Sequence, residues 1–167
     1  MVSKEVEKLL LKVQKPGRYV GGELNEVIKD KKKVDCRFAF CFPDTYEVGM
    51  SHLGMKILYS LMNAVPYIWC ERVFAPWVDM EEEMIKHNIP LYALESGDPV
   101  SDFDFIGFTL QYELSFTNML NMLRLSGVPI KSCDRKELKN IVVAGGPCPC
   151  NPEPIADFVD IFFIGEG

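Results

Sequence analysis

Short apolar runs alternate with segments of helical spacing from Cys36 to the end of this 167-residue chain, and this alternation is what most constrains its fold. Each run is nearly continuous, as in "CRFAFCF" and "NIVVAGG", so a strand formed by it is buried on both faces. The sequence therefore predicts an α/β fold: a doubly wound, mainly parallel sheet of five strands with helices on both faces, of the flavodoxin-like class. The expected strands are 36–42, 69–76, 103–111, 140–146 and 160–167, with an extended piece at 90–96, and the expected helical segments are 50–65, 78–88, 113–127 and 152–159.

The first 35 residues lie outside this alternation. They are predicted to form an extension, residues 1–35, ahead of a domain at 36–167. Ser3 is placed to cap a first helix that runs to about Val13. The proline and three glycines of "KPGRYVGGELNEV" then predict an irregular segment. The basic run "KDKKKVD" lacks interleaved aromatic residues and is predicted to be a solvated loop.

The composition narrows the classes of function. The formal net charge of -6 argues against nucleic acid as the main partner. No apolar run approaches the roughly 20 residues that cross a bilayer, and the N-terminus lacks the cleavage site of a signal peptide. Six cysteines in a chain of ordinary hydrophobicity favour reduced, mostly buried thiols. We therefore expect a cytoplasmic protein.

Three polar loops follow expected strands and are the places to look for a ligand. In parallel sheets, ligands bind beyond the carboxyl ends of the strands, where the strand order reverses. The loops are "PDTYEVGMS", "TLQYELS" and "GGPCPCNPEP". Gly145 and Gly146 open the third loop and allow either a close approach to a ligand or a tight turn without one. The glycine motifs for dinucleotides and nucleoside triphosphates are absent.

Cysteine and histidine spacing gives no catalytic or metal site. Cys148 and Cys150 form a single C-x-C without a second paired site, so we interpret them as structural or incidental thiols. His52 follows Ser51, which is expected to cap the helix at 50–65. No nucleophile and base are paired by spacing, and the chain alone is not expected to be catalytic.

Taken together, the three loops resemble the cobalamin-binding Rossmann domains at the N-terminus of many radical S-adenosylmethionine proteins. That family has D-x-H-x-x-G in the first loop, and "DTYEVG" supplies Asp44 and Gly49 in register, with Tyr46 in the histidine position. "IGFTLQ" places Thr109 where the family has serine and Gln111 where it has leucine. "VVAGGPC" matches the family's double glycine, and the sequence from residue 15 to 167 is similar to that of one subgroup of these proteins.

The resemblance implies a site and a partner. A radical S-adenosylmethionine domain, with its 4Fe-4S cluster and S-adenosylmethionine, would follow the G-E-G at 165–167, so this chain would be one domain of a longer enzyme. A bound cobalamin would lie between two sets of residues. The cobalt face would be lined by Asp44, Tyr46 and Gly49, and the slot for the nucleotide tail by Thr109, Gly145, Gly146 and Pro147.

Tyr46 separates the outcomes that this resemblance leaves open. A phenol with a pKa near ~10 is a poor neutral ligand for cobalt. We therefore expect a domain that holds, or descends from one that held, a cobalamin without a histidine lower ligand. The alternatives are another ligand in the crevice and a cofactor-free docking or scaffold domain. A flavin ranks last, because Asp44 and Glu47 would repel its phosphate.

Overall fold

The computed structural model describes residues 3–165, and their strands form one five-stranded sheet in which all paired neighbours are parallel. The strand order is β2-β1-β3-β4-β5, the flavodoxin-like order, which reverses between β1 and β3. The predicted α/β doubly wound fold is thus confirmed. The strands are β1 Cys36–Phe42, β2 Ile68–Phe74, β3 Phe105–Thr109, β4 Ile141–Gly145 and β5 Ile161–Phe162.

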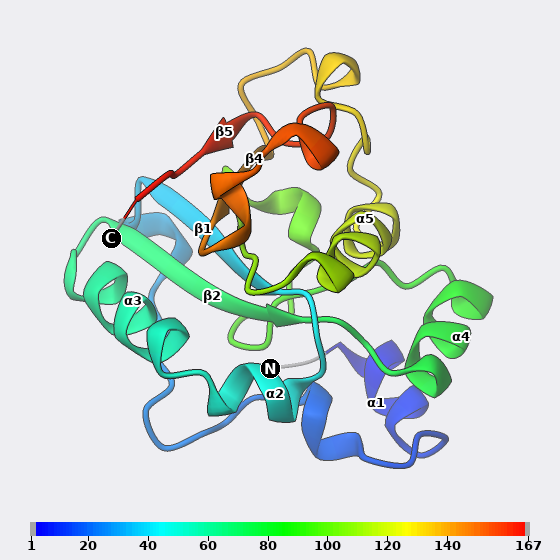
Figure 1. Cartoon of the computed structure of the whole chain (residues 1–167). Helices are drawn as coiled ribbons and strands as arrows, with labels where there is room; N and C mark the ends of the chain where they lie inside the picture. The colour runs from blue at the N-terminus through cyan, green and yellow to red at the C-terminus, as the bar shows by residue number, and fades with distance from the viewer. Residues whose placement is uncertain (1–2, 166–167) are drawn as a thin grey trace.

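Helices cover both faces of the sheet, as Figure 1 shows: α3 lies on one side of β1 and β2, and α1, α4 and α5 lie on the other. Alternate residues of β1 make the two cores. Cys41 is buried with the α1, α4 and α5 side, whereas Phe40 is buried with α3. No described helix is long and apolar enough to cross a membrane. The helices are α1 Lys4–Leu10, α2 Tyr46–Ser51, α3 Leu53–Ala64, α4 Val78–His87 and α5 Phe116–Leu125.

The first predicted loop is partly helical, which corrects the sequence interpretation. α2 occupies most of "PDTYEVGMS", and the helical conformation is interrupted between α2 and α3 at His52. His52, and not Ser51, caps α3, since its Nδ1 accepts a hydrogen bond from the Met55 amide at 3.1 Å. The Ser51 hydroxyl instead donates to the Val48 carbonyl at 2.7 Å, within α2.

Three other segments are shorter or less regular than predicted. Ser3 caps α1 as expected, but the helix ends at Leu10. The helix expected at 152–159 is a single 3-10 turn, Glu153–Ile155, because its amides donate to carbonyls three residues back, as Ile155 does to Pro152 at 3.0 Å. The extended piece at 90–96 contributes only an isolated bridge between Tyr92 and Pro99. The last residues of the predicted G-E-G, 166–167, lie outside the described residues.

Candidate functional site

The carboxyl edge of the sheet, at the reversal between β1 and β3, brings together part of the predicted site. Asp44 and Thr109 line one small surface pocket there. Thr109 is paired with Gly145 across β3 and β4. Gly146 follows with a φ of +98°, and a Cβ built on it would lie 2.7 Å from the Leu110 carbonyl oxygen. The predicted residues of the second and third loops therefore do lie side by side.

Two side chains outside the predicted set of site residues, Gln111 and Tyr112, close this edge. The Gln111 amide donates to Thr109 Oγ1 at 2.7 Å, and its nitrogen would lie 3.2 Å from a Cβ on Gly146. The Tyr112 hydroxyl donates to Asp44 Oδ2 at 2.5 Å, and this bond raises the pKa of Tyr112. The side chains leave no room for a water molecule in the pocket. The edge is thus filled by the protein's own polar groups.

Tyr46 is directed away from this edge. Its hydroxyl donates to Glu23 Oε1 at 2.6 Å, and its ring meets Phe74 edge-on with 5.4 Å between centroids. Burial, and then the bond to Glu23, raise the pKa of Tyr46 to about 12, so the phenol keeps its proton near neutral pH. Gly49 is a packing position, because an added Cβ would lie 2.2 Å from the Phe74 ring. Asp44 therefore bonds to Tyr112 at the carboxyl edge, whereas Tyr46 bonds to Glu23 of the N-terminal segment.

Pro147 begins the remaining predicted segment. It precedes the 3-10 turn Cys148–Cys150, in which Cys148 is buried and Cys150 is exposed. Burial raises the pKa of the Cys148 thiol, which lowers its reactivity. Among the described residues, no group of three or more histidine, cysteine or acidic side chains is arranged to hold a metal ion.

As they stand, these residues do not fit a cobalamin. The slot for its nucleotide tail would occupy the space that Gln111 takes above Thr109 and Gly146. The residue in the lower-ligand position, Tyr46, is a protonated phenol already bonded to Glu23. A bound corrinoid would require both side chains to move.

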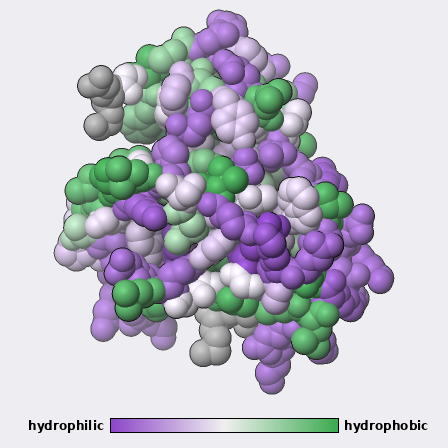
Figure 2. Space-filling model, turned by 60° about the horizontal axis from the view of Figure 1, so that its bottom comes forward, coloured by the Kyte–Doolittle hydropathy of each residue, from purple (hydrophilic) through white to green (hydrophobic). Residues whose placement is uncertain are grey.

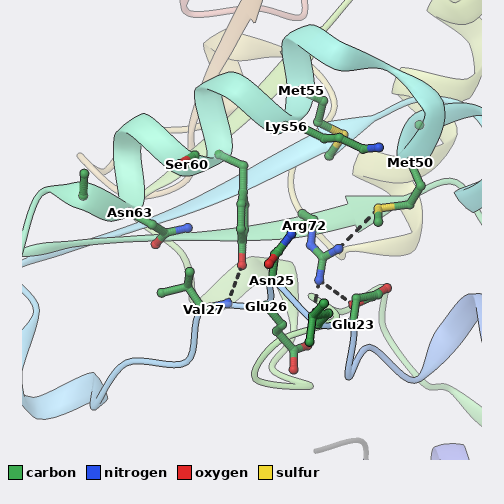
Figure 3. A pocket seen from close by; sticks show the side chains of 14 residues that line it. Glu23, Asn25, Glu26, Val27, Met50, Met55, Lys56, Ser60, Asn63 and Arg72 are labelled. Atoms are coloured by element: carbon green, nitrogen blue, oxygen red, sulfur yellow. Dashed lines mark hydrogen bonds and ion pairs between the residues drawn. The ribbon is translucent and has the colours of Figure 1, made fainter.

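A cavity that the sequence interpretation missed lies elsewhere, between α3 and the N-terminal segment 23–27 (Figure 3). Its volume is about 820 Å³, and Arg72 of β2 lies at its floor. A signal for it was present in the sequence: "WCERVF" places Glu71 and Arg72, both buried, inside an apolar strand. Buried charges of this kind require partners, and one partner of Arg72 comes from the segment 23–27.

Arg72 is held by carboxylates on two sides. Its Nε donates to Glu95 Oε1 at 2.6 Å, and its Nη2 donates to Glu23 Oε2 at 2.7 Å. The guanidinium also lies 5.1 Å from the centre of the Tyr59 ring. Burial works to raise the pKa of Glu23, but the bonds from Tyr46 and Arg72 outweigh it and hold that pKa below its ordinary value. Glu23 thus links the N-terminal segment to both β2 and α2.

Comparisons with known proteins give the family. The family model described as "Radical SAM proteins, N-terminal" matches residues 54–167. The Uncharacterized protein MJ0966 of Methanocaldococcus jannaschii is 40% identical over 129 residues, which are 77% of this chain and 23% of that protein. The chain thus matches about a quarter of the length of this relative, and no solved structure gives a significant match. This chain belongs to the family of N-terminal domains of radical S-adenosylmethionine proteins.

Proposed function

We propose that this chain is a docking and scaffold domain that binds the radical S-adenosylmethionine domain of its own protein through an exposed apolar face. Family membership supports a radical S-adenosylmethionine domain as the partner, because the matching model describes the N-terminal domains of such proteins. The relative from Methanocaldococcus jannaschii has more than three quarters of its length outside the matched region. That length is ample for a further domain.

The apolar outer side of α3 carries this proposal. Leu53, Ile57 and Leu61 recur every four residues and so form one stripe along the helix. They are 70%, 49% and 61% exposed, whereas Met55 and Tyr59 on the inner side are buried against β1 and β2. Figure 2 shows hydrophobic patches on the side of the molecule that includes α3. Exposed apolar side chains gathered along one side of a helix favour a site of protein association.

The half of the sheet formed by β3–β5 lies beside this face, beyond the residues that α3 covers. Strand register places Phe105, Val143 and Ile161 on the same side as Phe38, which packs with the residues beneath α3. The buried cluster beneath α3 contains residues of β1 and β2 but none of the described residues of β3–β5. Phe163, which follows β5, is 67% exposed. Since both faces of parallel sheets are normally covered, this half of the sheet favours a packing partner.

Cysteine accessibility tests the docking face. In a background in which the exposed Cys133 and Cys150 are replaced by serine, Leu61→Cys and Leu138→Cys should both react rapidly with a maleimide in this chain alone. In the protein that also carries the radical S-adenosylmethionine domain, Leu61→Cys should react at least about tenfold more slowly, because the docked domain covers it. Leu138→Cys, at a position that is 95% exposed on another segment, should keep its rate. Equal rates for Leu61→Cys in the two proteins would contradict docking through α3.

Cobalamin binding is the alternative to be tested, because Asp44, Thr109, Gly145 and Gly146 converge on the strand-order reversal although the side chains present do not fit the cofactor. The chain is mixed with hydroxocobalamin at about 50 μM and then desalted. We expect the protein fraction to show no corrin absorbance, because Gln111 and Tyr112 fill this edge. Buffer without protein gives the baseline. Retention of one corrin per chain would instead establish cobalamin binding and show that these side chains move aside.

A further inference from the structure

The cavity between α3 and the segment 23–27 has the size of a ligand site and lies apart from the carboxyl edge. Its volume of about 820 Å³ falls within the range of small-molecule sites, about 300–1,000 Å³. The segment at its mouth is tied down at both ends. At one end Glu23 accepts from Arg72, and at the other the Val27 amide donates to the Tyr59 hydroxyl at 2.8 Å. The two exposed residues between these ties are Leu24 and Asn25.

Arg72 retains unused donor capacity at this cavity. It is only 5% exposed, and its Nε and Nη2 are taken by Glu95 and Glu23. Among the described residues, the one acceptor for Nη1 is the Met50 sulfur at 3.3 Å (Figure 3). A thioether is a weak acceptor, whereas carboxylate and phosphate oxygens are the acceptors that a guanidinium binds most strongly. A ligand oxygen beside Met50 would satisfy this donor.

Lys56 adds a second cation to the same wall. It lines the cavity from α3, and within residues 3–165 its ammonium has no hydrogen-bond or ion-pair partner. In Figure 3 its side chain extends toward Met50, the residue that Nη1 of Arg72 contacts. The two cationic side chains therefore border one end of the cavity.

The acidic side chains of the cavity are engaged by neighbouring groups, Glu23 through both oxygens and Glu26 through one. Glu23 accepts from the Tyr46 hydroxyl at one oxygen and from Arg72 at the other. Glu26 accepts from the Gly22 amide at 3.0 Å and lies 3.8 Å from Arg72 Nη2. At the end of the cavity near Met50 the free capacity belongs to donors, Nη1 of Arg72 and the Lys56 ammonium, so that end suits an anion.

We propose that this cavity binds a small organic anion whose carboxylate or phosphate contacts Arg72 and Lys56. The apolar part of the ligand would lie against Met50, Met55 and Tyr59, which line the same cavity. Mostly apolar walls with a few convergent polar groups are typical of small-molecule sites. The proposal does not depend on the docking face, because Lys56 and Leu61 lie on different sides of α3.

Methionine-methyl NMR on the whole chain tests this proposal. Benzoate and phenyl phosphate carry the same ring with the two candidate anions, and benzylamine is the cationic counterpart. We expect at least one anion to shift the methyl resonances of Met50 and Met55 saturably, with Kd of about 1 mM or tighter, and benzylamine to leave them unchanged. Met50→Leu and Met55→Leu assign the two resonances. The tighter of the two anions identifies which oxyanion the site prefers.

Lys56→Glu gives the matched variant, because Lys56 is exposed and its loss leaves the buried network of Arg72 intact. It should raise the Kd of the anion by about tenfold, the effect of losing one charge-assisted hydrogen bond. Lys136→Glu, at an exposed lysine outside the cavity, should change the affinity by less than about twofold, because distant exposed charges are screened. Three results would each overturn the proposal: no saturable shift with either anion, equal binding of benzylamine, or full affinity in Lys56→Glu.

Discussion

Arg72→Met is expected to cost about 3–5 kcal/mol in the free energy of unfolding, the loss typical when one partner of a buried ion pair is removed. The substitution keeps most of the side-chain volume, so the effect reports the charge and not a cavity. The side chain of Glu95 is 0% exposed. Without the Arg72 guanidinium it would lose the attraction that offsets the cost of burying its charge. Even in the native pair, burial raises the pKa of Glu95 to about 7. The measurement is urea unfolding followed by circular dichroism.

A surface pair and a double variant separate this explanation from a general sensitivity to arginine loss. Arg124 pairs with Glu81 at 2.9 Å on the surface, with 52% and 24% of the two side chains exposed, so Arg124→Met should cost only about 0–1 kcal/mol. Adding Glu95→Gln to Arg72→Met should recover part of the lost stability, because it removes the buried charge. If Arg72→Met cost no more than Arg124→Met, the buried pair of Arg72 and Glu95 would contribute no more to stability than a surface pair.

The fold was accessible from the sequence because it rests on local patterns. The apolar runs of β1 and β4 predict buried parallel strands whatever lies far from them in the chain. The break at His52 was not accessible in this way. Ser51 and His52 are adjacent and both bear an acceptor, and only the backbone direction after α2 decides which of them reaches the Met55 amide. Cap identity is therefore a tertiary outcome at this position.

The candidate sites depend on contacts between distant segments, which local patterns do not contain. Tyr46 aligns with a ligand position in the motif, yet its hydroxyl contacts Glu23 of the N-terminal extension. Glu23 in turn reaches Arg72, 49 residues away. No spacing rule relates these three residues. Buried charge in an apolar strand was the one local sign, and it indicates that a partner exists without saying which one.

Gly146→Ala is expected to destabilise the protein by about 3 kcal/mol, since it combines two costs of about 1–3 kcal/mol each. The first is conformational, because φ at this position is +98°, a value that residues with a side chain rarely adopt. The second is steric: the new Cβ would lie 2.7 Å from the Leu110 carbonyl oxygen. That backbone is fixed, because the Leu110 amide donates to Gly145 at 2.8 Å and the Leu110 carbonyl accepts from Cys148 at 3.2 Å.

Gly127→Ala separates the two costs. Gly127 follows α5 with a φ of +70° and has no atom within 4 Å of a built Cβ, so alanine there meets the conformational cost alone, about 1–2 kcal/mol. Thermal unfolding of the two variants should therefore place Gly146→Ala clearly below Gly127→Ala in stability. Equal losses would mean that the turn after β4 can open away from Leu110. The carboxyl edge would then be able to widen, and the filled crevice would be a reversible state of the domain.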